Sequence, residues 1–369
     1  MTQSGCASRD WIVAIDGGGS KVAGALAKLE VGEPIERVQA IVRHSVQGTG
    51  SASPATWGQA SKNIVVAIEQ LLALANVAPH QIRHVVLMLA GAGRADDVAR
   101  VRQTLSTVSI FQDPAFIAGG GLTVTSDMRP LLDYATGLQP KLPTIVLIAG
   151  TGSLVAALDD NARDESQRVV RAGGWGPVLG DEGSGWRMAL SSLKRICDWI
   201  DRGSPTLSEH VVMQTSTRQH ELPSSDSSEL QALFEIVKRF ATEHRLMAED
   251  SQLNSAILAL ASDRHLAARL APAILDHAAR STEGLAYQLV DNEVAALAAQ
   301  VETVHRRMRF APHGWRLGLT GGLASNHVLF QTFLNKTLHQ RNISPESLVV
   351  LDPLLAALNF ASTNQARQT

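Results

Sequence analysis

Short apolar runs alternate with glycine-rich breaks through the first third of the chain. Three such runs predict strands, at residues 11–16, 22–29 and 38–43. The pattern then predicts a helix, a strand, a helix and a last short strand, at 55–75, 84–90, 95–105 and up to Asp127. This order is typical of a mixed α/β unit that opens with hairpins.

The same pattern restarts in the middle of the chain, which indicates a duplicated architecture. Strands are expected at 144–148, 154–158 and 168–171. Helical periodicity then dominates 185–308, apart from a polar stretch at 202–228 that we expect to be a surface loop. The chain closes with a strand, a helix, a strand and a helix, at 315–320, 325–339, 348–351 and from Pro353.

Length and composition narrow the classes of function. With 369 residues, two domains with a cleft between them are expected. The 33 Lys and Arg against 35 Asp and Glu argue against a nucleic-acid partner. No apolar run approaches the roughly 18 residues of a membrane span, so we expect no membrane association and a cytoplasmic protein. The two cysteines, Cys6 and Cys197, do not form a disulfide or metal pattern.

The first predicted strand ends in Asp16, Gly17, Gly18, Gly19, Ser20 and Lys21. Glycine lets backbone amides approach phosphate oxygens closely, and the Asp16 carboxylate could hold a hydrated Mg²⁺. The glycine spacing matches neither a Walker A loop nor a dinucleotide fingerprint. An ordinary hairpin turn explains this segment equally well on its own.

The second set of strands has a similar turn, formed by Gly150, Thr151, Gly152 and Ser153. Its amides and hydroxyls suit phosphate oxygens, although strand-end residues can also satisfy their own backbone. Two such turns at the starts of two duplicated hairpins favour a shared nucleotide. We therefore expect the two turns to face each other across a cleft.

Asp127 stands at the tip of a predicted strand and precedes a helical pattern. A carboxylate there could accept the proton of a hydroxyl that attacks the γ-phosphate of a nucleotide. The alternative is an N-cap for the helix that follows, and the two roles could coexist.

A glycine-dense segment at 173–185 carries one large aromatic residue and two carboxylates. Gly174, Trp175 and Gly176 offer a flat apolar wall, and Asp181 lies close to it in sequence, which suits a polyhydroxylated ring. Helix-dipole complementarity could also explain Asp181 and its neighbour Glu182. Beside the phosphate turns, this segment predicts a kinase that acts on a small sugar. The glycine pair Gly321 and Gly322 is a weaker motif that could lie against an adenine or ribose.

Together these motifs resemble the acetate and sugar kinase, heat-shock and actin superfamily. Within it they resemble the N-acetylglucosamine kinase branch of the BadF/BadG/BcrA/BcrD-type ATPases. The matching motifs are DGGGSK at 16–21, LAGAG at 89–93, TSD at 125–127, IAGTGS at 148–153, GGWGPVLGDEGSG at 173–185 and TGGL at 320–323. The resemblance covers nearly the whole chain and implies a two-domain actin-like ATPase fold of duplicated ribonuclease H-like domains around a central cleft.

The resemblance also implies boundaries and roles. The first domain would comprise 1–137 and 353–369, and the second 138–352 with a helical insertion at 185–310. It implies ATP and Mg²⁺ as cofactors and a homodimer that closes on its ligands. The implied roles are phosphate contacts for Ser20 and Thr151, the base for Asp127, sugar contacts for Gly174, Trp175, Gly176 and Asp181, and a nucleotide contact for Ala267.

The chain departs from the family pattern at one position. Where relatives carry an asparagine that holds the sugar, this chain has Ser53, whose hydroxyl cannot donate twice or reach as far as an amide. The sequence therefore predicts phosphorylation of the 6-hydroxyl of an amino sugar, with N-acetylglucosamine first and glucosamine or N-acetylmuramic acid as alternatives. An ATPase activator of a 2-hydroxyacyl-CoA dehydratase, with an iron–sulfur cluster, is a rival, and a non-catalytic sugar sensor is another.

Overall fold

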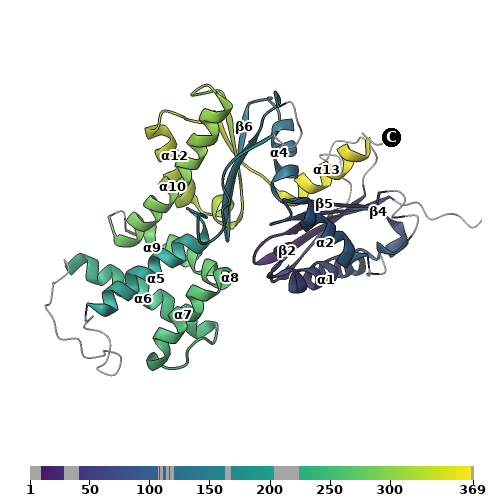
Figure 1. The fold of residues 1–369 in the computed structure, drawn as a ribbon. Helices are drawn as coiled ribbons and strands as arrows, with labels where there is room; N and C mark the ends of the chain where they lie inside the picture. The colour runs from purple at the N-terminus through teal and green to yellow at the C-terminus, as the bar shows by residue number, and fades with distance from the viewer. Residues whose placement is uncertain are drawn as a thin grey trace, which may run out of the picture. The chain divides into compact units, whose positions relative to one another are not determined.

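Figure 1 shows the chain in a computed structural model, which describes residues 10–28, 41–106, 108, 111–113, 116, 120–162, 168–202, 224–281 and 283–366. The chain forms two compact units. Unit 1 comprises Met1–Thr144 and Leu351–Thr369, and unit 2 comprises Ile145–Val350. The sequence placed the corresponding boundaries at 137/138 and 352/353.

Unit 1 is built on a five-stranded sheet with the order β3-β2-β1-β4-β5. Its strands are β1 (Trp11–Gly17), β2 (Lys21–Lys28), β3 (Ile41–Gln47), β4 (Ile82–Leu89) and β5 (Leu122–Ser126). β1, β2 and β3 pair antiparallel, whereas β4 and β5 continue the sheet parallel to β1. The carboxyl ends of three parallel strands therefore meet at one edge of the sheet.

Helices cover both faces of this sheet (Figure 1). On one face, α1 (Trp57–Ala75) buries an apolar stripe that includes Ile64, Ile68 and Leu71 against strand residues such as Ile15. α2 (Ala95–Leu105) contacts α1 and β5. The other face is covered by α13 (Pro353–Ala366), which packs against β1, β4 and α4 (Met128–Gly137).

Unit 2 repeats the strand order of unit 1. Its strands are β6 (Thr144–Ala149), β7 (Ser153–Leu158), β8 (Val169–Gly173), β9 (Arg316–Thr320) and β10 (Ser347–Val350). Read from β8, the order is β8-β7-β6-β9-β10, with β6, β7 and β8 antiparallel and β9 parallel to β10. The predicted duplication is confirmed, because each sheet places its first strand at the centre and its fourth and fifth strands on the far side.

The helices of unit 2 are α5 (Gly185–Asp201), α6 (Ser224–Glu243), α7 (Leu253–Ser262), α8 (Arg264–Ala267), α9 (Ala271–Ala278), α10 (Leu285–Met308), α11 (Gly322–Asn326) and α12 (Val328–Gln340). α10 packs against β7 and β8 and also against α5, α9 and α12. The single helix expected at 325–339 is two helices, α11 and α12, which meet at His327 in an extended conformation. Most of the polar stretch predicted at 202–228 lies outside the described residues.

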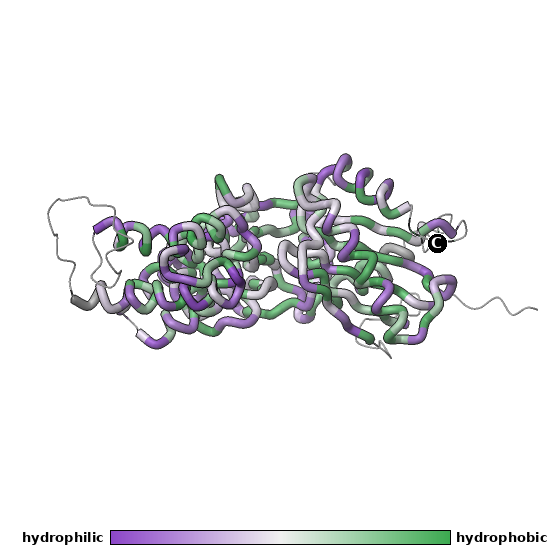
Figure 2. The backbone as a smooth tube through the Cα atoms, turned by 90° about the horizontal axis from the view of Figure 1, so that it is seen from below, coloured by the Kyte–Doolittle hydropathy of each residue, from purple (hydrophilic) through white to green (hydrophobic). Residues whose placement is uncertain are grey.

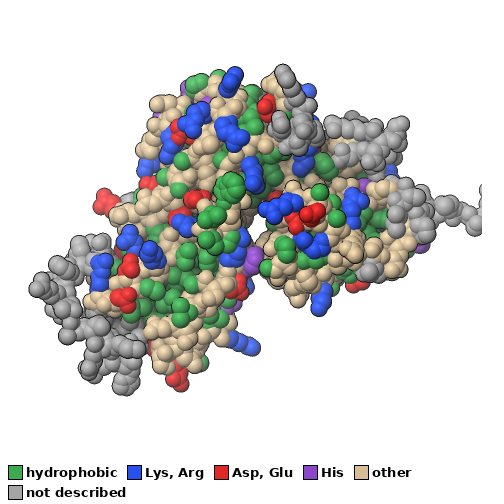
Figure 3. Space-filling view, in the orientation of Figure 1, with side chains coloured by type: hydrophobic (Ala, Val, Ile, Leu, Met, Phe, Trp, Pro, Cys, Tyr) green, Lys and Arg blue, Asp and Glu red, His purple; other side chains and the backbone are tan. Residues whose placement is uncertain are grey.

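Side-chain polarity follows this architecture. Hydrophobic residues are concentrated along the strands and at the helix faces that cover them (Figure 2). On the face shown in Figure 3, basic and acidic side chains are interspersed, as the near-neutral net charge of −2 suggests. Within the described residues, no helix has the length and apolar character of a bilayer-crossing segment.

Candidate active site

The first glycine turn (Gly17, Gly18, Gly19 and Ser20) joins β1 to β2. The Gly18 amide donates to the Lys21 carbonyl at 3.1 Å. Among the described residues, no acceptor receives a hydrogen bond from the amides of Gly19 and Ser20 or from the Ser20 hydroxyl. Backbone amides need partners, so two consecutive free amides beside a hydroxyl are suited to an anion.

The loop after β3 fixes the first glycine turn from one side. The Gly50 amide donates to the Gly18 carbonyl at 2.8 Å, and the Gly48 amide donates to the Ser20 carbonyl at 3.0 Å. Gly17 and Gly50 are so close that a Cβ on Gly17 would lie 2.5 Å from the Gly50 carbonyl oxygen. Glycine is required at Gly17 because no side chain can fit between the two backbones.

Two carboxylates gather at the edge where β1 and β5 end. Asp16 pairs with Met88 of β4, which pairs with Thr125 of β5, so these residues share one face of the sheet. Asp127 follows two residues after Thr125 and adjoins the same face. Burial raises the pKa of Asp16 to about 7, and the nearby Asp127 charge adds to the rise while Lys21 opposes it.

Asp127 precedes the first residue of α4 but does not act as a side-chain cap. Its carboxylate accepts no capping hydrogen bond from the first turn of the helix. Burial raises its pKa, and the backbone amides of Asp127 and Met128 act in the opposite direction. The structure therefore shows no side-chain cap at Asp127, although the backbone amides of Asp127 and Met128 interact with its carboxylate.

A third carboxylate, Asp352, has structural partners. One oxygen accepts from the amides of Leu354 and Leu355 at 2.9 and 3.3 Å, which caps α13. The other oxygen pairs with the Arg43 guanidinium at 2.7 Å. Asp352 also contributes to the raised pKa of Asp16.

The chemistry of Asp16 and Asp127 fits a hydrated divalent cation. Within the described residues, no three Asp, Glu, His or Cys side chains cluster as a metal cage. Mg²⁺ in nucleotide sites is usually held by one or two carboxylates together with phosphate oxygens and several waters. These two carboxylates on one sheet edge are of the type that this donor set uses, and the Mg²⁺ role of Asp16 stays a prediction.

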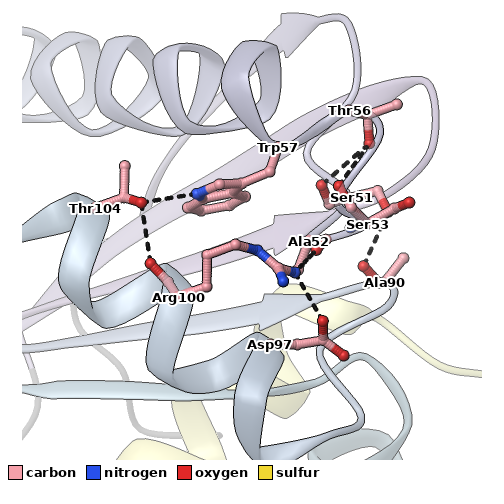
Figure 4. A network of polar contacts seen from close by, with 9 residues as sticks. All are labelled: Ser51, Ala52, Ser53, Thr56, Trp57, Ala90, Asp97, Arg100 and Thr104. Carbon is pink, nitrogen blue, oxygen red and sulfur yellow. Dashed lines mark hydrogen bonds and ion pairs between the residues drawn. The ribbon is translucent and has the colours of Figure 1, made fainter.

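Figure 4 shows how the loop that carries Ser53 is held between two helices and a turn. The Arg100 guanidinium donates to the Ala52 carbonyl at 2.6 Å and pairs with Asp97 at 2.7 Å. The Ser51 hydroxyl donates to the Ala90 carbonyl at 3.1 Å. The Ser53 hydroxyl has no partner among the described residues, so it remains available to a ligand.

The second glycine turn (Gly150, Thr151, Gly152 and Ser153) joins β6 to β7. The Gly150 amide donates to the Gly152 carbonyl at 2.9 Å. Within the described part of the chain, the amides of Thr151 and Gly152 and the Thr151 hydroxyl have no acceptor. Unit 2 thus repeats the arrangement of unit 1, with two free amides and one free hydroxyl.

The 173–185 loop is bonded directly to the second glycine turn. The Ser153 hydroxyl donates to the Glu182 carbonyl at 2.7 Å, and the Ser153 amide donates to an Asp181 carboxylate oxygen at 3.3 Å. The Gly185 amide donates to the Gly150 carbonyl at 2.8 Å. The two motifs that the sequence assigned separately to phosphate and sugar therefore form one hydrogen-bonded structure.

Asp181 does not face open space in this structure. It is 3 % exposed, and its second carboxylate oxygen accepts from the Arg264 guanidinium at 3.2 Å. Burial raises the pKa of Asp181, and Arg264 opposes that rise. The direct sugar contact predicted for Asp181 would require these bonds to open, because both carboxylate oxygens already accept hydrogen bonds.

Trp175 lies on the surface of unit 2. The side chain is 67 % exposed, with the Arg171 guanidinium 5.4 Å from its ring centroid. Its neighbours Gly174 and Gly176 have φ values of 70° and 84°, a backbone conformation that favours glycine. The ring is thus presented on a sharply turned segment.

The remaining predicted nucleotide contacts have different surroundings. Gly321, with φ 90°, lies so close to β6 that a Cβ would be 2.5 Å from the Ala149 carbonyl oxygen, and Gly322 adjoins Gly150. The structure therefore brings this glycine pair to the second glycine turn. Ala267 has no exposed surface, so its predicted nucleotide contact has no support from this structure.

A family model supplies the decisive comparison. The model described as the BadF/BadG/BcrA/BcrD ATPase family matches residues 13–353, which is most of the chain. The chain belongs to this family. Both glycine turns, both carboxylates and the 173–185 loop lie within the matched region.

Two curated relatives match part of the chain. A Clostridium acetobutylicum N-acetylmuramic acid/N-acetylglucosamine kinase is 24 % identical over 55 % of this chain and 59 % of its own length. A Dictyostelium discoideum N-acetyl-D-glucosamine kinase is 23 % identical over 54 % of this chain and 58 % of its own length. The chain thus spans somewhat more than half the length of each relative.

Two crystal structures resemble the whole chain. One, of a candidate N-acetylglucosamine kinase from Chromobacterium violaceum, has a TM-score of 0.61 at 20 % identity and covers 95 % of this chain and 98 % of its own. The other, of a candidate N-acetylglucosamine kinase from Porphyromonas gingivalis, has a TM-score of 0.56 at 16 % identity and covers 96 % and 99 %. With the repeated strand order, this likeness confirms the predicted two-domain actin-like α/β fold.

Sequence reasoning did not find several residues that hold the site. Glu293 of α10 accepts from the Gly183 amide at 3.1 Å, and Gln300 donates to the Glu182 carboxylate at 2.7 Å. Arg264 and Arg100 hold Asp181 and Ala52 from helices that are distant in sequence. No local motif marks these residues, because each acts through a partner far away along the chain.

Proposed function

We propose that this BadF/BadG/BcrA/BcrD-type ATPase is an ATP- and Mg²⁺-dependent kinase of an amino sugar. The transfer would be to the 6-hydroxyl, and N-acetylglucosamine is the first candidate. The two curated relatives are kinases of N-acetylated amino sugars, which supports this substrate class. The observation that carries the proposal is the uncapped Asp127 carboxylate beside Asp16, at the sheet edge that also holds the first glycine turn.

Asp127 would accept the proton of the sugar hydroxyl as that oxygen attacks the γ-phosphate. A base works best when its pKa lies near the working pH, and burial raises the pKa of Asp127 in that direction. The free amides of the glycine turns would stabilise charge on the phosphate oxygens. Asp16 would hold the Mg²⁺, which supplies charge neutralisation on the phosphates when it is bound.

The residues proposed for sugar binding are Ser53, Gly174, Trp175 and Gly176. The Ser53 hydroxyl is free, and the Trp175 ring is exposed. A serine hydroxyl is shorter than the amide of an asparagine and makes fewer hydrogen bonds. Glucosamine and N-acetylmuramic acid therefore remain as alternative substrates.

A panel of sugars tests the activity directly. ADP release would be measured with ATP and Mg²⁺ in the presence of N-acetylglucosamine, glucosamine, N-acetylmuramic acid or glucose. We expect sugar-dependent ADP release with at least one amino sugar, and phosphorylation at the 6-hydroxyl by NMR of the product. No sugar-dependent ADP release from a folded protein that binds ATP would instead support a non-catalytic sensor.

The variant Asp127→Asn tests the mechanism. Loss of a general base costs about 10²–10⁴-fold, so turnover should fall by at least two orders of magnitude while ATP binding is retained. Asp133→Asn, on the same helix and paired with Arg129, is the matched control and should keep full activity. Normal turnover in Asp127→Asn would exclude Asp127 as the base.

The rival function, an iron–sulfur activator of a dehydratase, depends on cysteine ligands. Cys197 lies half-buried within α5, where burial and the nearby Asp201 and Asp198 raise the pKa of its thiol. A raised thiol pKa disfavours the thiolate that ligates iron. Cys6 lies outside the described residues. An absorption spectrum and an iron assay of the purified protein distinguish the two functions, and light scattering tests the expected homodimer.

A further inference from the structure

The two glycine turns differ in which basic side chain lies near them. The first turn is followed at once by Lys21, an exposed side chain at the start of β2. The second turn is followed by Leu154, and no Lys or Arg lies within the 148–162 segment around it. A turn that binds a triphosphate needs a cation as well as amides, because the phosphate carries several negative charges.

Arg264 supplies this charge from α8. A Cβ placed on Gly152 would lie 2.8 Å from the Arg264 Nη2 atom, so the guanidinium lies against the free-amide segment of the turn. The same nitrogen donates to Asp181 at 3.2 Å. The Arg264 side chain remains 31 % exposed, which leaves part of the guanidinium open to a ligand.

The hydrogen-bonding capacity of Arg264 is not fully used by the protein. A guanidinium has five N–H donors. The described residues satisfy Nη2 through Asp181, whereas the Nε atom is buried and has no partner among them. A buried donor without a partner is costly, and an incoming phosphate that draws the guanidinium into new bonds would remove part of that cost.

The position of α8 is set by a close approach to α5. A Cβ on Gly185 would lie 2.8 Å from the carbonyl oxygen of Ala268, the residue that follows α8, and α8 itself also contacts α5. Gly185 in turn donates its amide to the Gly150 carbonyl of the second glycine turn. Arg264 is thus held in a fixed relation to the turn by contacts other than its own ion pair.

We propose that Arg264 binds a nucleotide phosphate at the second glycine turn, with Asp181 as the counter-ion that orients it. This inference rests on the proposed ATP-dependent function and names a binding residue for it. Asp181 can orient the guanidinium because the Ser153 amide fixes its carboxylate and because it is shielded from solvent. Arg264 would then play in unit 2 the part that Lys21 plays in unit 1.

Nucleotide binding to the intact protein tests this without relying on turnover. Dissociation constants for ATP, ADP and adenosine would be measured by calorimetry for the wild type, Arg264→Gln, Arg264→Lys and Arg269→Gln. Hydrogen bonds to charged groups contribute about 1.5–3 kcal/mol, so Arg264→Gln should weaken ATP and ADP binding at least about tenfold. Arg264→Lys should lose less, because it keeps the charge, and adenosine affinity should change less than twofold in every variant.

The control is Arg269→Gln, an exposed arginine on the same segment, which should bind all three ligands as the wild type does. Equal ATP affinity in wild type and Arg264→Gln would overturn the proposal. An equal loss for adenosine and ATP would also overturn it, since it would indicate a structural role alone. A wild type that binds no ATP would instead refute the proposed function, so the two failures are distinguishable.

Discussion

Units 1 and 2 have the same strand order and the same type of turn, yet they differ in side-chain chemistry. Each turn leaves two adjacent amides and one hydroxyl free among the described residues. At the penultimate paired position of the first strand, unit 1 has Asp16, whereas unit 2 has Ile148. The duplicated backbone therefore provides free amides and a hydroxyl twice, whereas Asp16 and Asp127, the carboxylates that we propose for metal and base, both lie in unit 1.

The strongest test of this comparison concerns two glycines that stand at backbone contacts. A Cβ would lie 2.5 Å from a carbonyl oxygen both at Gly17 and at Gly321, and Gly321 also has a positive φ. In each contact one backbone belongs to the end of a central strand, Gly17 in β1 and Ala149 in β6. We expect Gly17→Ala and Gly321→Ala each to lower the free energy of unfolding by about 2–4 kcal/mol. Chemical denaturation measures this.

Neighbouring glycines provide the controls. A Cβ on Gly18 would have only an ordinary 3.5 Å contact, and one on Gly322 would meet nothing within 4 Å. Gly18→Ala and Gly322→Ala should therefore change stability by less than about 1 kcal/mol. A large effect in one unit only would show that the two turns are not equivalent in their packing.

The next test concerns the pKa of Asp16, the carboxylate at a position where unit 2 has Ile148. The pKa of Asp16 is raised from 3.8 to about 7, so between these pH values the folded state binds more protons than the unfolded chain. Stability must then fall as pH rises through this window and level off above pH 7. The full shift would correspond to about 4 kcal/mol. Asp16 keeps some exposed surface, so solvent screening reduces this value. We expect Asp16→Asn to remove that fall and to be roughly 1–2 kcal/mol more stable than the wild type at pH 8, with little difference near pH 4.

Thermal unfolding at pH 4 and pH 8 gives the result. Asp276→Asn, which removes an exposed carboxylate in unit 2, should show the same pH dependence as the wild type. If Asp16→Asn keeps the full wild-type pH dependence, the Asp16 carboxyl has an ordinary pKa. Asp16 would then not distinguish unit 1 from unit 2 by a raised pKa.

The smallest expected effect concerns the loop of Ser53. Arg100→Gln removes a charge-assisted hydrogen bond to the Ala52 carbonyl and leaves Asp97 without its cation. The KM for the sugar should rise about three- to tenfold, while the KM for ATP should stay within twofold. Steady-state kinetics with each substrate varied in turn measures both constants.

Arg102→Gln is the matched control, because Arg102 is exposed on the same helix. Arg100→Lys should recover part of the sugar affinity, since lysine can donate to the Ala52 carbonyl. Parallel increases in both KM values would contradict a local role and indicate that the whole of unit 1 has been loosened.

Much of the fold could be predicted because local patterns decide it. α2 has the predicted bounds, and β6 and α13 begin where the sequence indicated. The strand predicted at 38–43 was less accurate, since β3 is described from Ile41 and continues to Gln47. His44, Ser45 and Gln47 are polar because β3 is an edge strand, so an apolar run could not reveal its full length.

The site was predictable only where its chemistry is local. The glycine turns and Asp127 could be read from consecutive residues at strand ends. The burial of Asp181 could not, because its partner Arg264 lies 83 residues away and in another helix. Burial also limits what a resemblance can predict. Ala267 was assigned a nucleotide contact by resemblance, but the residue is fully buried.

The return of α13 to unit 1 has a consequence for the order of folding. Unit 2 is one continuous stretch of chain, whereas the sheet of unit 1 needs α13, which follows all of unit 2, to cover β1 and β4. During synthesis on the ribosome, one apolar face of that first sheet must wait uncovered until some two hundred further residues have emerged. The sheet made first is therefore the last to be completed.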